Sequence, residues 1–331
     1  MAKKIDGSSL YRRIILHALE LAWGHKHLWI FGLFAAFIGF GGIADVFFQA
    51  WQKGSNTPLM ASGSVLQLFP NLETLSSFMT YSPRPILSLL IFVFIFLAFV
   101  AVFVALVSVS VGALVSGIKK IEAGGDNDFI IGIKNGMRNF WNVMPILFLQ
   151  KILIGAAFLV SMSNLLILLR SSDLVSTFMY GIGFIVLTLL AISASLVGVF
   201  AVMTTVSKKT SLKDSIRHGW DMLTTHWLVS IEMSIALLVA SLAITVVAIL
   251  GVLILSVPLI FFLFIAAISG ASSVVVGILT FTALLVIAAL LTTAAFTTTF
   301  QTAAWVFLWQ DMTEREPVAK LHRIAAHFKN A

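Results

Sequence analysis

Between Leu228 and Trp309 the chain carries one ionisable residue, Glu232, in an otherwise apolar or small-polar sequence. About 20 apolar residues in a helix already cross the ~30 Å hydrocarbon core of a bilayer. Over all 331 residues, 60% are hydrophobic and 11% are charged, whereas soluble domains carry about 45–50% and about 25%. Such a chain has too few charges to cover a water-exposed surface. We therefore predict an all-α, multi-pass membrane protein.

The long apolar runs predict about six transmembrane helices. They are expected at residues 28–50, 86–118, 144–169, 181–206, 228–256 and 273–309. The segment that joins the last two, residues 257–270, contains Pro258 and an apolar run too short to cross a bilayer. An interfacial or re-entrant hairpin is one interpretation of this segment. A further pair of crossings within residues 228–309 is the alternative.

The distribution of positive charge predicts the orientation in the membrane. The formal net charge is +7, and on this topology only Lys53, Arg84 and Arg170 fall on the side opposite to both termini. Lysine and arginine are enriched in cytoplasmic loops of membrane proteins. We therefore expect a bacterial cytoplasmic (inner) membrane location, with both termini cytoplasmic and with anionic headgroups of the cytoplasmic leaflet as partners. Nucleic-acid binding is not expected.

Tryptophan residues fall near the basic ends of the expected spans. Because the amphipathic indole ring favours headgroup depth, they are predicted to be interfacial anchors. These residues are Trp23, Trp29, Trp141, Trp220, Trp227, Trp305 and Trp309.

Three stretches share one layout, in which an amphipathic segment leads through tryptophan into a pair of spans. They define expected repeat units at about residues 8–120, 126–208 and 209–310. Gly136 in the second unit aligns with Gly219 in the third. The amphipathic segments are too polar to span and too apolar to remain in water, so we expect them in the headgroup plane. A similar amphipathic helix is expected at residues 317–329, within a single membrane domain covering residues 1–331.

Local signals predict where individual helices begin and end. Ser211, followed three residues later by Asp214, is typical of a helix N-cap, and Asp128 can cap the helix that follows it. The glycine pair Gly124–Gly125 is expected to end the second span. The acidic and glycine residues at 123–128 could instead suggest a cation loop, but the remaining calcium ligands are missing.

Residues 199–244 carry a span, a short polar turn, an amphipathic helix with the pair Gly219–Trp220, and a second span that starts near Trp227. This arrangement, with the stretch from Phe300 to Trp305, resembles uncharacterised bacterial membrane proteins around the glycerophosphoryl diester phosphodiesterase membrane-domain family. The resemblance implies a helical membrane domain. It implies no catalytic residues, because no soluble phosphodiesterase domain is attached.

Ionisable residues within the expected spans are candidates for a specific role, since each costs about 2.5–3.5 kcal/mol at mid-membrane. Lys151 and Glu232 lie at matched depths when the repeats are aligned on their glycines. We hypothesise that they form a buried ion pair, although Lys151 could instead extend to the headgroups. Asp45 lies toward the outer end of the first span.

The last span is rich in small polar residues, among them Thr297, Thr298 and Gln301. Such residues commonly pack membrane helices closely and hydrogen-bond within them; a polar cavity is the alternative. The chain has no cysteine, and no nucleophile, metal-ligand or nucleotide motif is found. We expect a non-enzymatic membrane scaffold or accessory protein without cofactor or metal. A small-solute or ion transporter that uses the repeat interface is the second hypothesis.

Overall fold

The computed structural model describes residues 8–37, 85–125, 128–170, 174–208, 210–270 and 272–314. Within these ranges the secondary structure consists of eight helices, and no strand occurs. The predicted all-α membrane protein is therefore confirmed. Asp45 and the expected helix at 317–329 lie outside the described residues.

The helices of the described part are mostly much longer than those of soluble proteins. They are α1 (Ser8–Gly24), α2 (Leu28–Ala36), α6 (Pro85–Glu122), α7 (Phe129–Arg170), α8 (Leu174–Lys208), α9 (Leu212–Thr225), α10 (Trp227–Ile268) and α11 (Ser272–Glu314). In the described part, five of them (α6, α7, α8, α10 and α11) are long and apolar enough to cross a membrane. The first expected span, 28–50, is described only as far as residue 37, where α2 has ended.

The chain divides into two compact units, Ala44–Leu106 and the remainder. Residues 85–106 of α6 belong to the smaller unit, and their apolar side chains are mostly exposed, as expected for a lipid-facing helix. Residues 107–122 of α6 belong to the larger unit together with all the other described helices. The features discussed below lie in the larger unit.

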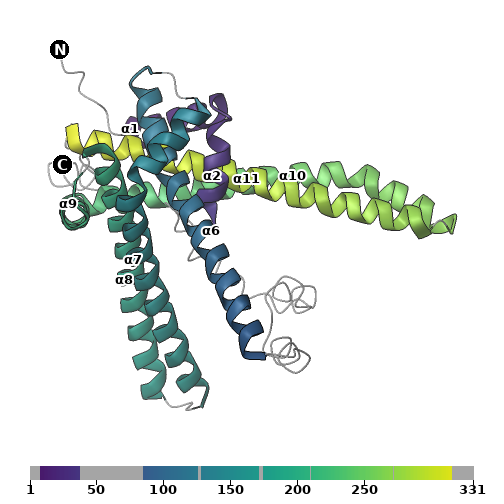
Figure 1. Ribbon diagram of the computed structural model, residues 1–331, viewed down its shortest axis with the longest axis horizontal. Helices are drawn as coiled ribbons and strands as arrows, with labels where there is room; N and C mark the ends of the chain where they lie inside the picture. The colour runs from purple at the N-terminus through teal and green to yellow at the C-terminus, as the bar shows by residue number, and fades with distance from the viewer. Residues whose placement is uncertain are drawn as a thin grey trace, which may run out of the picture. The chain divides into compact units, whose positions relative to one another are not determined.

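Two antiparallel helical hairpins form much of the larger unit. Helix α7 lies beside α8, and α10 lies beside α11 (Figure 1). The turn of the second hairpin falls at Ser269–Gly270, where Gly270 has φ +70°, a conformation that glycine adopts without strain. Helix α10 therefore continues through 257–268, and the expected interfacial or re-entrant hairpin at 257–270 is wrong. Pro258 lies inside the helix because its ring removes only one backbone donor and the next turn can continue.

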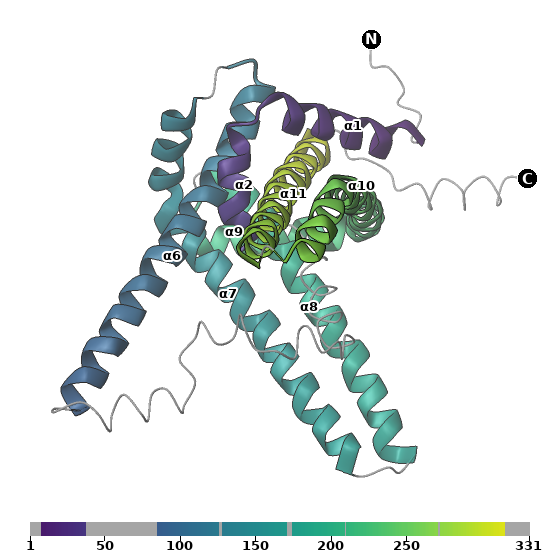
Figure 2. The ribbon, with the colours of Figure 1, turned by 90° about the vertical axis from the view of Figure 1, so that its right-hand side faces the viewer.

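The amphipathic segment of the second unit also differs from the expected separate helix. It forms the first part of α7, which runs through Pro145 without interruption. In the third unit the corresponding segment is a separate helix, α9, because His226 leaves the helical conformation at φ −120° and ψ 33°. The first unit has a similar break at residues 25–27, and Figure 2 shows α2 leaving α1 at a sharp corner.

The buried core lies at one end of the long helices. Fully buried side chains come from the final turns of α6, α8 and α11, from the first turns of α10 and from residues 143–147 of α7. Helices α1, α2 and α9 pack around them. The largest are Trp305, Phe200, Phe300, Leu28, Leu114, Ile118, Leu147, Met203, Met233 and Leu308. The distal halves of α10 and α11 expose apolar side chains, which suits contact with lipid.

Glycines permit two equivalent helix contacts in the core. A side chain at Gly136 would collide with the backbone oxygen of Val109 and the side chain of Ala113. At Gly219 a Cβ atom would lie 2.8 Å from the backbone oxygen of Val197 and close to Ala201. Backbones approach closely where small residues face each other in membrane helices.

The predicted helix ends agree with the structure. The Asp214 backbone N–H donates to the Ser211 hydroxyl at 3.3 Å, and the Phe129 backbone N–H donates to the Asp128 carboxylate at 2.7 Å. Gly124 has φ +74° directly after α6. Short-range capping chemistry therefore predicted these boundaries correctly.

Candidate functional site

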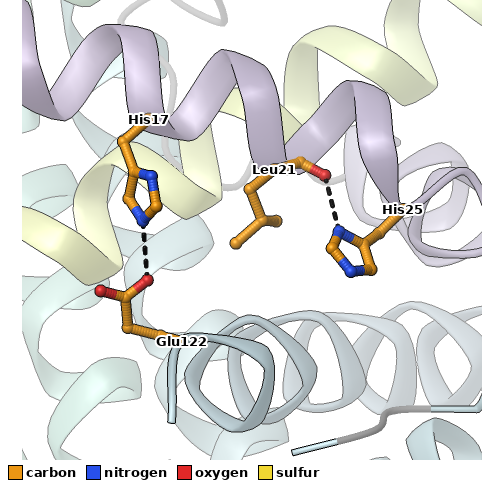
Figure 3. A network of polar contacts seen from close by, with 4 residues as sticks. All are labelled: His17, Leu21, His25 and Glu122. Carbon is orange, nitrogen blue, oxygen red and sulfur yellow. Dashed lines mark hydrogen bonds and ion pairs between the residues drawn. The ribbon is translucent and has the colours of Figure 1, made fainter. Parts of the chain in front are cut away.

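Helix α1 is held to three other helices by polar side chains. The Tyr11 hydroxyl donates to Glu232 of α10 at 2.5 Å, and Arg13 Nη2 donates to Asp311 of α11 at 3.0 Å. His17 Nε2 lies 2.8 Å from the Glu122 carboxylate at the end of α6 (Figure 3). We call these three contacts the α1 clamp. Each partner is an acidic residue close to the end of a long helix that contributes to the core.

An apolar stripe beneath these contacts packs α1 onto α11. Ile14, Ala18, Leu21 and Ala22 are buried at helical spacing, and the ring of His17 lies 4.6 Å from that of Phe307. The amphipathic segment predicted in the first unit is thus a helix whose apolar face contacts protein. The clamp and the stripe together determine the position of α1.

The corner between α1 and α2 is fixed by the backbone of α1. The Trp29 indole N–H donates to the Ala22 carbonyl at 2.6 Å, and His25 Nδ1 contacts the Leu21 carbonyl at 3.2 Å (Figure 3). Carbonyls in the last turn of a helix lack intrahelical partners. The side chains that follow α1 therefore cap it and turn the chain into α2.

The ion pairs of the clamp are partly exposed. The side chains of His17 and Glu122 are 48% and 37% exposed, and those of Arg13 and Asp311 are 46% and 14% exposed. Exposed pairs contribute about 0–1 kcal/mol each, because water screens them and the side chains lose freedom. The clamp therefore specifies where α1 docks more than it stabilises the fold.

The partner found for Glu232 differs from the one considered in the sequence. Its carboxylate accepts from Tyr11, which precedes it by 221 residues, and Tyr11 was not identified as a candidate. The ion pair of Glu232 with Lys151 stays a prediction. No local signal points to Tyr11, since its role depends on how α1 crosses α10.

Removal of the Tyr11 hydroxyl is expected to weaken the contact between α1 and α10. Tyr11→Phe should lower the free energy of unfolding by about 1.5–3 kcal/mol, the range for a hydrogen bond to a charged group. Tyr180→Phe is the matched control, because the described contact of Tyr180 is ring stacking on Phe184, which the variant keeps. The measurement is the thermal midpoint in detergent. Equal midpoints for the two variants would contradict a stabilising role for the Tyr11–Glu232 bond.

The polar residues singled out in the last span are largely packed in the core. Gln301 is 7% exposed and donates to the Ser241 hydroxyl at 2.7 Å, which joins α11 to α10. Thr298 is 8% exposed, and its backbone oxygen accepts from Thr302. The Thr297 hydroxyl is buried and has no hydrogen-bond partner among the described residues. Of these three residues, Gln301 has the described side-chain hydrogen bond to α10.

Gln150 is a buried polar residue that the sequence did not indicate. It is 4% exposed and its Nε2 donates to the Ser195 backbone oxygen at 3.2 Å, which joins α7 to α8. A side chain at Gly198 would collide with the Gln150 amide. Gly198 is the sequence signal that could have indicated this contact, because a glycine within a membrane helix leaves room for a large side chain of the neighbouring helix.

The predicted tryptophan anchors separate into two groups. Trp23, Trp141, Trp220 and Trp227 are exposed, as expected at headgroup depth, and Trp29 is half-buried. Trp305 and Trp309 are 2% and 5% exposed, so they pack against protein, and their role as interfacial anchors stays a prediction. They lie on the face of α11 that packs in the core, where Trp305 meets Phe200 of α8.

The surface helix α9 contacts protein through two small residues and through Met222 and Leu223, which are both 8% exposed. The small residues Ser215 and Gly219 are buried against α8, whereas Leu212 and Trp220 are exposed. The Thr205 hydroxyl of α8 donates to Ser215 at 2.6 Å. Leu212 and Trp220 are therefore available to lipid.

His27 has surroundings that disfavour its charged form. Burial lowers the pKa of His27, and His25 lowers it further, while Asp128 opposes the shift. His27 Nε2 is buried without a hydrogen-bond partner among the described residues. In the described part of the chain, no three histidine or acidic side chains lie close enough to hold a metal ion.

Comparisons of the chain with family models, with curated proteins and with solved structures found no match. The candidate function therefore rests on the contacts described above.

Proposed function

We propose that this protein is a non-enzymatic scaffold or accessory protein of the bacterial cytoplasmic membrane, with both termini on the cytoplasmic side. In this proposal the long hairpins cross the bilayer, and α1 and α9 lie at the inner headgroup layer. The proposal includes kinship with the membrane-domain family that residues 199–244 resemble. Its partners are lipids, including anionic headgroups of the inner leaflet.

The observation that carries the proposal is that buried hydroxyl groups donate their hydrogen bonds to the backbone of their own helix. Ser234, Thr299 and Thr302 donate to backbone oxygens four residues earlier in their own helices. A hydroxyl bonded in this way is satisfied without water or substrate. The polar residues of α10 and α11 therefore support helix packing, as a scaffold requires.

The equivalent glycine contacts also support the proposal. Gly136 meets α6, and Gly219 meets α8, through the residue types valine and alanine in each case. We infer that the second and third units descend from one repeat whose amphipathic segment docks on the preceding span. Repeated docking of this kind builds a closed helical framework at the inner face of the membrane.

A transporter is the second candidate, and a separate observation favours it. The polar atoms that are buried without hydrogen-bond partners among the described residues include Ser108 Oγ, Gln150 Oε1 and Thr297 Oγ1. Buried polar groups normally have partners, and water or a solute can supply them. A wet route through the bundle would satisfy these atoms.

Cysteine accessibility distinguishes the two candidates, because the chain has no native cysteine. Ser234→Cys and Thr298→Cys place thiols at core positions that are 4% and 8% exposed. Thr224→Cys on α9 and Ser273→Cys beside the turn of α10 and α11 are exposed controls expected on opposite faces. The rate of labelling by a membrane-impermeant maleimide is measured from each side of sealed vesicles.

A scaffold predicts that both core thiols react at least about tenfold more slowly than the controls from either side, because a packed core excludes water and the reagent. The two controls should each react from one side, and those sides should be opposite. Fast labelling of either core thiol would overturn the scaffold and favour the transporter. Controls that react from the same side would overturn the topology.

A further inference from the structure

Basic side chains from three helices converge near the ends of α6 and α8. Lys208 Nζ lies 3.4 Å from His218 Nε2, which joins the last turn of α8 to α9. Lys119, in the last turn of α6, is close enough to Lys208 for Coulomb repulsion between the two ammonium groups. We call these residues the Lys119–Lys208–His218 cluster. Two ammonium groups that repel each other raise the free energy of the folded protein unless an anion compensates their charge.

No acidic side chain of the described residues lies within 4.0 Å of any member of this cluster. The contrast with the α1 clamp is direct, because there each basic group has its own carboxylate. Glu122, in the same turn of α6 as Lys119, binds His17. The cluster therefore carries positive charge that the described protein groups leave uncompensated.

The pKa of His218 depends on the same surroundings. Burial lowers its pKa, and Lys208 lowers it further, whereas Asp221 on the next turn of α9 opposes the shift. The neutral imidazole can accept a hydrogen bond from the Lys208 ammonium. An anion that bound both lysines would reverse the effect of Lys208 and favour the protonated imidazole.

The helix dipoles explain why each lysine lies in the last turn of its helix. They do not explain why the two lysines and His218 lie together. Cations are favourable in the last turn of a helix, where Lys119 and Lys208 both lie. That effect acts within the first or last turn of one helix, so it gives no reason for Lys208 to approach His218 of α9. The juxtaposition is a tertiary feature.

Trp309 adds a further donor beside the cluster. Its ring centroid lies 5.7 Å from Lys119 Nζ, and its side chain is 5% exposed. The indole Nε1 is buried and has no hydrogen-bond partner among the described residues. A buried donor without an acceptor costs about 1–3 kcal/mol, and an anionic oxygen could supply that acceptor.

We propose that Lys119, Lys208 and His218 bind a phosphate group, and that its source is the headgroup of an anionic membrane lipid. Lysine ammonium groups are strong donors to phosphate oxygens. The neighbouring Trp220 is 54% exposed on α9 and is available to lipid, which favours a lipid over a soluble phosphate. This site deepens the proposed function, because it names the lipid contact and rests on α9 lying at the headgroup layer.

The test uses the full-length protein in a neutral detergent with added phosphatidylglycerol, phosphatidylcholine or inorganic phosphate. Lys119→Gln/Lys208→Gln removes both charges of the cluster. Lys134→Gln/Lys213→Gln is the matched control, because it removes two charges at exposed positions. Bound lipid is counted by native mass spectrometry, and the dissociation constant is obtained by titration.

We expect one tightly bound phosphatidylglycerol in the wild type and in the control, and at least about tenfold weaker binding in the cluster variant. Inorganic phosphate should compete poorly, because it lacks the acyl chains. If phosphate alone binds equally well and the cluster variant loses it, the ligand is a soluble phosphate and the lipid source is overturned. Equal phosphatidylglycerol binding by both double variants would overturn the site.

A single variant covers the case in which the cluster variant does not fold. His218→Gln keeps a side-chain donor and removes the titrating group, so it should abolish the tightening of phosphatidylglycerol binding that we expect in the wild type between pH 7 and pH 5. An unchanged pH dependence would contradict the site. Failure of the site and failure of the scaffold are separable, since the labelling rates of the core cysteines do not depend on the charges of the Lys119–Lys208–His218 cluster.

Discussion

Trp305→Ala is expected to lower the free energy of unfolding by about 3–5 kcal/mol, the range for tryptophan truncation in a packed core. Trp305 is 2% exposed, and its ring meets Phe200 of α8 edge to face at a centroid distance of 5.9 Å. The variant would leave a cavity at the contact of α11 with α8. Lipid cannot replace the lost contacts because the site is enclosed by protein. The thermal midpoint in detergent and resistance to trypsin report the effect.

Trp220→Ala is the matched control for this variant. Trp220 has the same side chain but is 54% exposed on α9, so detergent or lipid can occupy the space that alanine leaves. We expect less than about 1 kcal/mol of change, the usual range for surface substitutions. Comparable losses from both variants would contradict the enclosure of Trp305 by protein.

Gly32→Ala is expected to destabilise the protein by about 1–3 kcal/mol, because it forces a methyl group into a closed contact. A Cβ atom at Gly32 of α2 would collide with the Thr299 hydroxyl and the Ala295 backbone oxygen of α11. The backbone oxygen cannot move without a shift of the helix. The expected result is a lower midpoint and faster hydrogen exchange in α2.

Gly155→Ala provides the control of opposite sign. A Cβ atom at Gly155 of α7 meets nothing within 4 Å, and alanine is favoured over glycine in a helix by about 0.5–1 kcal/mol. This variant should therefore be neutral or slightly stabilising. A Gly32→Ala protein as stable as Gly155→Ala would show that α2 does not approach α11 as closely as described.

Local chemistry made several features predictable. Long apolar runs indicated the spans that became α6, α7, α8, α10 and α11, because the cost of placing polar groups in hydrocarbon depends on composition alone. The caps at Ser211 and Asp128 were predicted for a similar reason. An N-cap bond joins residues at most three apart, so the sequence contains the whole interaction.

Other features were missed or mistaken where a choice depended on neighbouring helices. Residues 257–268 continue α10 although Pro258 suggested an interruption. Trp305 and Trp309 have the same local pattern as the exposed tryptophans, and only the rotation of α11 against α8 places them inside. Gln150 belongs to the same class, since its partner is on α8.

The amino-acid sequence by itself determined that the chain is an all-α membrane protein, roughly where its long helices lie, and how several of them are capped. These properties follow from transfer free energies and from contacts within one turn. The tertiary structure alone decided that Tyr11 meets Glu232, that Arg13 meets Asp311, and that Lys208 meets His218. The physical reason is that a contact between helices depends on their rotation and crossing, which the packing of the whole core sets.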